Sequence, residues 1–292
     1  MKLPSADWTE RRGLAALIAA LDGKARFVGG AVRDTLLGIP VKDVDIATPL
    51  AFSDDWQEDA ARRDFTINAL SADPATMEIH DYFGGLENLE QRRIRFIGSA
   101  AERIAEDHLR IMRYFRFLAR FGLHDLDADA FQACVDAAPK LERLSRERVA
   151  DELLKLLATN DPRFAVGKML EGRIFEHIIA GTDKLAGPIL DRLVRREQVH
   201  GIPPGAIRRL VALLPKAAEQ AETIAKSLKL SKKQQRALGE RLPAQPEEMT
   251  QPTAILFRGE NDIRALAYRT GVDAARDIAL LFADDDALTD LL

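Results

Sequence analysis

Two aspartates separated by one residue carry the most distinctive chemistry in this chain. Asp43 and Asp45 flank Val44 in the stretch KDVDIAT. The apolar neighbours predict a half-buried strand, on which alternate side chains point to the same face. Two carboxylates on one face repel each other unless a cation lies between them, and Mg²⁺ commonly bridges carboxylates and substrate phosphates. We therefore predict that both aspartates bind Mg²⁺; a solvated edge strand is the alternative.

A pair of glycines lies just upstream, where a predicted strand at residues 26–30 meets a predicted helix at residues 31–37. Gly29 and Gly30 allow the backbone to approach a ligand closely, and N–H groups at the start of a helix attract phosphate oxygens. Arg33 could add a bidentate contact to phosphate, and Gly38 can end the helix. A tight turn without a ligand is the alternative, but the nearby aspartates favour phosphate.

The stretch RRDFTINAL adds two cations. Arg62 and Arg63 precede a run of apolar residues that we expect to form a helix. Adjacent arginines beside such a helix would suit a triphosphate or ribose, and surface salt bridges are an equal alternative.

The region after Gly98 is predicted to be helical. Ser99 and Glu102 form a capping box that opens a helix expected to run to about Phe121. An apolar stripe at helical spacing consists of Ile104, Ile111, Phe115 and Leu118. A charged ridge on the other side consists of Asp107, Arg110, Arg113 and Arg116.

This ridge could recognise a base. Cytosine and adenine both present an exocyclic amine beside a ring nitrogen that accepts a hydrogen bond. A carboxylate can accept from the amine and a guanidinium can donate to the nitrogen. Asp107 with Arg110 would then accept C and A and reject U and G, leaving Arg113 and Arg116 for phosphate or for orientation. Ion pairing on a solvated helix is the alternative.

Composition narrows the class of protein. With 292 residues, 47% of them hydrophobic and 30% charged, the chain suits a globular protein with more than one core. A single cysteine, Cys134, allows no internal disulfide, so we expect a cytoplasmic protein whose metal is hard and bound by oxygen. No apolar run approaches the roughly 20 residues of a membrane span, and the N-terminus lacks the apolar core of a signal peptide.

The rest of the chain divides by pattern and charge. Further strands are expected at residues 76–83 and 92–97, and helices begin at Ser145 and Ser231 and run from Arg264 to Phe282 with a break near Gly271. Residues 192–241 hold twelve Lys and Arg against four Asp and Glu, a balance of +8, and residues 242–292 balance at −6. The basic segment suggests a polyanion partner; taken alone, a solvated helical face is the better interpretation.

Resemblance to a known family rests on four blocks: GGAVRDTLLG with KDVDIAT, DAARRDFTINAL, HDYFGGLENLEQRRIRFIG and ERIAEDHLRIMRYFRFLARFG. They resemble the class II tRNA nucleotidyltransferases, the bacterial CCA-adding enzymes, and the related bacterial poly(A) polymerases. The resemblance is dense over residues 26–122 and weak in the C-terminal half. It implies an α+β fold with a nucleotidyltransferase-type α/β head over residues 1–98. It further implies a helical neck over residues 99–160 that recognises the base, and a helical body and tail over residues 161–292 that bind tRNA.

The resemblance also assigns residues. It implies that Asp43 and Asp45 are the catalytic Mg²⁺ ligands. The implied nucleotide-binding set consists of Gly29, Gly30, Arg33, Arg63, Asp64, Asn68, Asp107, Arg110, Arg113 and Arg116. The basic segment becomes a predicted tRNA-backbone surface, with Arg208, Arg209, Lys229, Lys232, Lys233 and Arg236 as contacts.

The implied activity is addition of C and A to the tRNA 3′ end from CTP and ATP, with release of pyrophosphate. Alternatives are poly(A) polymerase, a CC-only or A-only enzyme, and an inactive RNA-binding relative; the sequence leaves protein partners unknown. The sequence departs from the family pattern at one place, and this bears on all of these activities. Near Leu50 and Ala51 the family normally has several tens of additional residues, including two strands and an acidic residue, and this sequence lacks them. Either the segment is truly deleted, which would expose the head's core, or the sequence omits it and the numbering closes over the gap. We favour the omitted segment and expect a break in the chain between about Thr48 and Phe52.

Overall fold

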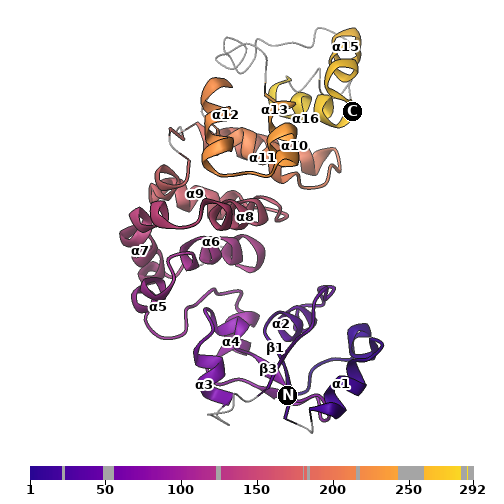
Figure 1. Cartoon of the computed structure of the whole chain (residues 1–292), viewed down its shortest axis with the longest axis vertical. Helices are drawn as coiled ribbons and strands as arrows, with labels where there is room; N and C mark the ends of the chain where they lie inside the picture. Colours follow the sequence, from indigo (N-terminus) through magenta and orange to yellow (C-terminus); the bar gives the residue numbers. More distant parts are fainter. Residues whose placement is uncertain are drawn as a thin grey trace. The chain divides into compact units, whose positions relative to one another are not determined.

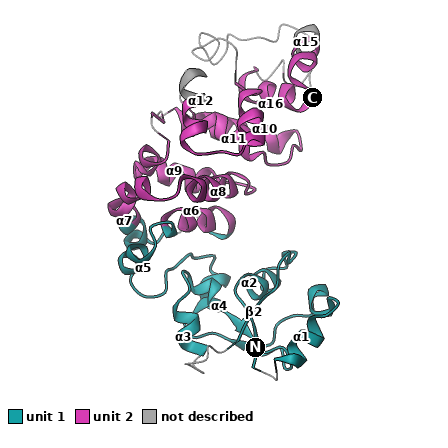
Figure 2. Ribbon diagram, viewed as in Figure 1, with its two compact units in different colours: residues 1–110, 121–133 teal, residues 111–120, 134–292 magenta. Residues whose placement is uncertain are grey.

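The computed structural model describes residues 1–21, 24–48, 56–122, 126–179, 181–182, 185–214, 218–242, 260–283 and 288. The chain forms two compact units (Figure 2), one of Met1–Arg110 with Phe121–Ala133 and one of Ile111–Arg120 with Cys134–Leu292. Small antiparallel strands in the first unit and helices elsewhere confirm the predicted α+β class. The three-part division at residues 98 and 160 stays a prediction.

A four-stranded antiparallel sheet lies in the first unit (Figure 1). Its order is β2-β1-β3-β4, formed by β1 (Arg26–Val28), β2 (Asp45–Ala47), β3 (Ser71–Ala72) and β4 (Ile79–His80). Val28 pairs with Asp45 on one side and with Ser71 on the other. Asp45 therefore lies on an edge strand, directly beside the residue that leads into the Gly29 turn.

Short helices surround this sheet: α1 (Leu14–Ala20), α2 (Gly30–Leu36), α3 (Trp56–Ala61) and α4 (Gly85–Glu90), with 3₁₀ helices at Asp7–Glu10 and Thr66–Asn68. Trp8 fastens α2 to the sheet. Its ring meets that of Phe27 edge to face with centroids 4.8 Å apart, and its Nε1 donates to Thr35 Oγ1 at 2.8 Å. This packing fixes the strand-to-helix turn between β1 and α2.

The predictions for the head that depend on backbone conformation at glycines are confirmed. Gly29 and Gly38 both have positive φ, 64° and 66°, and α2 begins and ends between them as expected. The apolar helix expected after Arg63 is wrong, because the backbone of this segment pairs with residues 95–97: Thr66 N donates to Arg95 O at 3.0 Å. In the described part of the chain, residues 92–97 contribute one bridge, between Phe65 and Phe96, instead of a strand.

The helix expected from Ser99 to Phe121 is two helices, α5 (Ala100–Glu106) and α6 (Arg110–Phe121). Asp107 interrupts it with an extended backbone, φ −150° and ψ 105°. Its Oδ1 accepts from Leu109 N at 3.0 Å, and such local bonds compete with helix continuation. Asp107 therefore does not share a helical ridge with Arg110, Arg113 and Arg116 of α6, which corrects the predicted geometry. All four residues of the apolar stripe are buried.

Helices make up the remainder: α7 (Ala128–Ala137), α8 (Arg146–Leu157), α9 (Arg163–Glu171), α10 (Ala186–Val199), α11 (Ala206–Leu213), α12 (Ala218–Ser227), α13 (Lys232–Gly239), α15 (Glu260–Thr270) and α16 (Val272–Phe282), with 3₁₀ helices at Ala138–Arg143 and Ile174–His177. Ser145 caps α8, and Ser231 forms a full capping box with Gln234, as predicted. Gly271, with φ 87°, makes the predicted break. Among the described helices, none combines the length and apolar character that a membrane crossing requires.

Candidate active site

The side chain of Arg63, which follows α3, lies next to the Gly29 turn. A Cβ atom on Gly29 would lie 3.0 Å from Arg63 Nη1, and φ of 64° disfavours any other residue. Arg63 Nη2 also contacts Asp59 Oδ2 at 3.3 Å. Arg62, in contrast, forms an exposed ion pair with Glu58 at 2.5 Å. Of the two adjacent arginines, Arg63 therefore lies next to the Gly29 turn, whereas Arg62 forms a surface ion pair.

A buried polar chain joins the next three predicted residues. Arg33, Asn68 and Asp64 are 5%, 7% and 7% exposed. Arg33 Nη1 donates to Asn68 Oδ1, and Asn68 Nδ2 donates to Asp64 Oδ1 at 2.9 Å. Asp34, which the sequence did not single out, accepts from Arg33 Nε at 2.8 Å. The structure thus brings together residues from two motifs more than 30 positions apart, and these bonds hold the Arg33 guanidinium in one orientation.

The aspartate pair lies at the sheet edge. Asp45 begins β2 opposite Val28, whereas Asp43 precedes the strand, and both are exposed. The expectation that alternate strand residues point to one face therefore applies to Asp45 but not to Asp43, which lies outside β2. Arg11 fixes the preceding loop, since its Nη1 donates to Lys42 O at 2.7 Å.

The oxygen atoms of these two carboxylates can be compared with the ligands that Mg²⁺ requires. Over the described residues, no group of three or more His, Cys, Asp or Glu is arranged to hold a metal ion. Two exposed carboxylates beside the Gly29 turn fit a Mg²⁺ ion that shares its coordination with substrate phosphates and water. The predicted interruption near Leu50 falls within residues 49–55, outside the described part of the chain, and stays a prediction.

The start of α6 carries the predicted base-recognition pair. Arg110 Nη1 contacts Glu106 Oε2 at 2.5 Å and donates to Arg103 O at 2.7 Å. The hydrogen bond from Arg110 lowers the pKa of the Glu106 carboxyl below its usual value. Sequence reasoning missed Glu106 and Arg103; the i, i+4 spacing of Glu106 and Arg110 was the available signal. Asp107 lies at the junction between α5 and α6.

The other two arginines of the predicted set belong to the second unit. Arg116 Nε donates to Glu152 Oε2 on α8 at 2.6 Å, with the two side chains 15% and 7% exposed. The guanidinium carbon also lies 4.4 Å from the ring centroid of Phe117. Arg113 lies 5.8 Å from the same ring. The structure thus gives Arg116 a role in packing α6 against α8.

Two of the predicted RNA contacts need correction. Arg208 and Arg209 are 3% and 1% exposed. Both bind Glu197, at 2.5 Å and 2.6 Å, and Arg208 also contacts Asp277. Guanidinium groups enclosed by carboxylates within the second unit cannot also contact an RNA backbone.

The other four predicted RNA contacts are exposed: Lys229, Lys232, Lys233 and Arg236. Lys229 forms an ion pair with Glu147 at 3.0 Å and Arg236 one with Glu240 at 2.8 Å. Two of these four cations are therefore already paired with carboxylates at the surface, so the positive surface that remains for RNA is smaller than the count of charges suggests.

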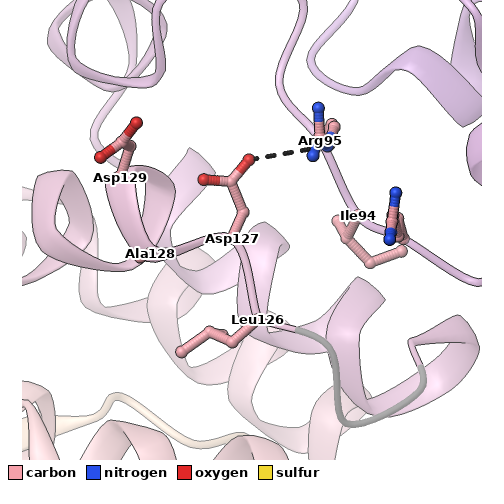
Figure 3. A pocket seen from close by; sticks show the side chains of 7 residues that line it. Ile94, Arg95, Leu126, Asp127, Ala128 and Asp129 are labelled. Carbon is pink, nitrogen blue, oxygen red and sulfur yellow. Dashed lines mark ion pairs between the residues drawn. The ribbon is translucent and has the colours of Figure 1, made fainter.

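A cavity of about 320 Å³ lies away from all these residues, between residues 93–95 and the start of α7 (Figure 3). Arg95 faces Asp127 across it, with Nε and Oδ2 3.9 Å apart, and Asp129 lies beside them. Both charge signs line this cavity, and no predicted site residue does. The candidate site is instead the open turn formed by Gly29, Arg63 and the sheet edge.

Comparison with known proteins finds matches in both halves of the chain. Residues 25–51 and 49–95 match the model of the poly A polymerase head domain, and residues 125–185 match that of the probable RNA and SrmB-binding site of polymerase A. The head matches in two stretches that meet where the sequence predicts a missing segment. CCA-adding enzymes of Streptococcus sanguinis and Streptococcus pneumoniae CGSP14 are 36% and 34% identical over 206 residues, 53% of this chain and 51% of each relative. The chain therefore matches about half the length of these curated relatives.

Solved structures give the same fold. The Bacillus stearothermophilus CCA-adding enzyme in complex with CTP is 26% identical, with 93% of this chain and 78% of that chain covered and a TM-score of 0.70. The Thermotoga maritima CCA-adding enzyme complexed with tRNA is 20% identical, covers 99% and 84%, and has a TM-score of 0.69, a likeness of fold alone. With the head match, these likenesses show that the chain is similar to CCA-adding enzymes and to the poly A polymerase head domain.

Proposed function

We propose that this chain adds C and A nucleotides to the 3′ end of tRNA, using CTP and ATP and releasing pyrophosphate. The convergence of Arg63 on Gly29, beside the buried chain from Arg33 through Asn68 to Asp64, carries the proposal. Relatives named CCA-adding enzymes support the choice of activity. The tRNA 3′-hydroxyl would attack the α-phosphate of the incoming nucleotide, and pyrophosphate would leave.

In this mechanism the protein supplies position and charge. Arg63 would contact the triphosphate beside Gly29, where a side chain would obstruct it. Arg33 is held by Asp34 and Asn68, so its orientation does not depend on the ligand. Asp43 and Asp45 would hold Mg²⁺, which when bound neutralises charge that develops on phosphate oxygens.

Base choice is proposed to rest on the junction between α5 and α6. Asp107 would accept the exocyclic amine of C or A, and Arg110 would donate to the neighbouring ring nitrogen. Glu106 supports Arg110 by pairing with its guanidinium. Arg113 and Arg116 remain proposed contacts for phosphate or orientation, although the ion pair with Glu152 gives Arg116 a packing role as well.

The tRNA backbone is proposed to contact the exposed part of the basic segment, formed by Lys229, Lys232, Lys233 and Arg236. Charge–phosphate contacts of this kind act without regard to base sequence. We place the activity in the cytoplasm, because the lone Cys134 is buried and a chain with one cysteine has no internal disulfide to maintain.

The decisive experiment incubates a tRNA lacking its terminal CCA with CTP, with ATP, or with both, and sequences the products. Ordered CCA in the presence of both nucleotides supports the proposal. Long A tails from ATP alone would indicate poly(A) polymerase, and products ending in CC would indicate a partial enzyme. Binding of tRNA without any incorporation would identify an inactive relative and refute the proposed activity.

Base recognition has its own test. Asp107→Ala should lose kcat/KM for CTP and ATP while UTP changes little, because UTP presents a carbonyl where C and A present the amine. An unpaired buried polar group costs about 1–3 kcal/mol, so selectivity should fall roughly tenfold to a hundredfold or more. A uniform loss for CTP, ATP, UTP and GTP with a lower melting temperature would give Asp107 a structural role only.

A further inference from the structure

One arginine joins the triphosphate side of the site to the base-recognition side. Arg103 Nη2, on α5, donates to the backbone carbonyl of Arg63. The Arg63 guanidinium lies next to the Gly29 turn. A change in Arg103 therefore acts on the backbone that positions Arg63, without removing any group proposed to contact the nucleotide.

The other end of the same guanidinium holds Glu106. Arg103 Nη1 donates to Oε2 and Oε1 of Glu106 at 2.8 Å and 3.0 Å. Glu106 contacts Arg110, and Arg110 Nη1 donates back to Arg103 O at 2.7 Å. These bonds close a ring of three side chains next to Asp107. Arg103 thus fixes the orientation of the carboxylate on which Arg110 depends.

Burial and geometry make this link specific to arginine. The Arg103 side chain is 13% exposed, and its buried Nε has no hydrogen-bond partner in the described part of the chain. The two terminal nitrogens of a planar guanidinium point in fixed directions and can bond two groups at once, whereas an ammonium is a single point of charge. A lysine at this position could reach Glu106 or the Arg63 carbonyl, but not hold both in one geometry.

We propose that Arg103 is a positioning residue that couples base recognition to placement of the triphosphate. A base accepted at Asp107 and Arg110 is then presented at a fixed place relative to Arg63, and a base that displaces Arg110 disturbs Arg63 through Glu106 and Arg103. This inference rests on the proposed function, since it takes Arg63 and Arg110 as nucleotide contacts.

The test combines Arg103→Lys with Arg63→Ala in a double-mutant cycle. For each variant, kcat/KM for CTP and UTP is measured on one tRNA, together with equilibrium binding of both nucleotides and the melting temperature. Arg163→Lys is the matched control, because Arg163 also bonds nearby carboxylates, of Asp161 and Asp191, and lies in the other unit.

We expect Arg103→Lys to reduce the preference for CTP over UTP about tenfold, within the range of coupling found inside one hydrogen-bond network. In the Arg63→Ala background the same substitution should change that preference less than about threefold. Equal effects in both backgrounds, or an unchanged preference with a lower melting temperature, would overturn the proposal. If the unmodified chain incorporates no nucleotide, the proposed function fails; the binding cycle still decides the coupling, because additive effects on CTP affinity refute it.

Discussion

Removing the Glu197 carboxylate should destabilise the second unit strongly. Glu197 is 1% exposed and binds Arg208 and Arg209, which are equally enclosed. Breaking a buried ion pair by removing one partner costs about 3–5 kcal/mol, because an uncompensated charge is left in the interior. We expect Glu197→Ala to fall toward the lower end of this range. Arg208 keeps Asp277 and the Pro203 carbonyl as partners.

The assay uses the distribution of tryptophans. Trp8 and Trp56, the two tryptophans of the chain, lie in the first unit, so their fluorescence reports on that unit while far-UV circular dichroism reports mainly on helices. A loss of about 3 kcal/mol lowers the melting temperature by roughly 6–12 °C for a unit of this length. The ellipticity transition should shift and the tryptophan transition should stay in place.

Arg236→Ala is the control, because its ion pair with Glu240 has a similar distance, 2.8 Å, but an arginine that is 83% exposed. Exposed i, i+4 pairs contribute roughly 0.3–0.5 kcal/mol. If Glu197→Ala costs no more than this control, the argument from burial is wrong.

Other predictions concern the site and its support. Asp45→Ala should abolish turnover while tRNA affinity barely changes; retention of a tenth of wild-type kcat, a barrier change of about 1.4 kcal/mol, would count against a two-aspartate metal site. Exchanging Lys232 and Lys233 for Glu should weaken tRNA binding and flatten its dependence on salt. An unchanged salt slope in filter-binding titrations would show that this surface does not contact tRNA. Gly85→Ala should lower both melting temperature and activity, because the new Cβ would lie 2.4 Å from the Thr66 carbonyl oxygen; an unaltered melting curve would contradict this.

The sequence determined the features that depend on a few neighbouring residues. The turn at Gly29, the caps at Ser145 and Ser231 and the break at Gly271 follow from backbone conformation and short-range hydrogen bonds. The apolar stripe from Ile104 onward also marked buried positions correctly, because apolar side chains at helical spacing lie on one face of a helix. The resemblance of four sequence blocks to a known family added a set of candidate site residues to these local features.

Long-range packing decided the rest. The residues around positions 208–209 do not indicate that Glu197 binds both arginines or that Asp277 binds Arg208. A cation on a helix has the same sequence pattern whether its partner is a phosphate or a carboxylate 69 positions away. Asp107 likewise fitted a helical pattern, yet its backbone is extended and its side chain bonds Leu109 N just before α6, so it separates two helices. Residue types and spacing set which chemistry is available, whereas the tertiary structure sets which charges remain free to perform it, because burial and pairing depend on parts of the chain that local patterns do not reach.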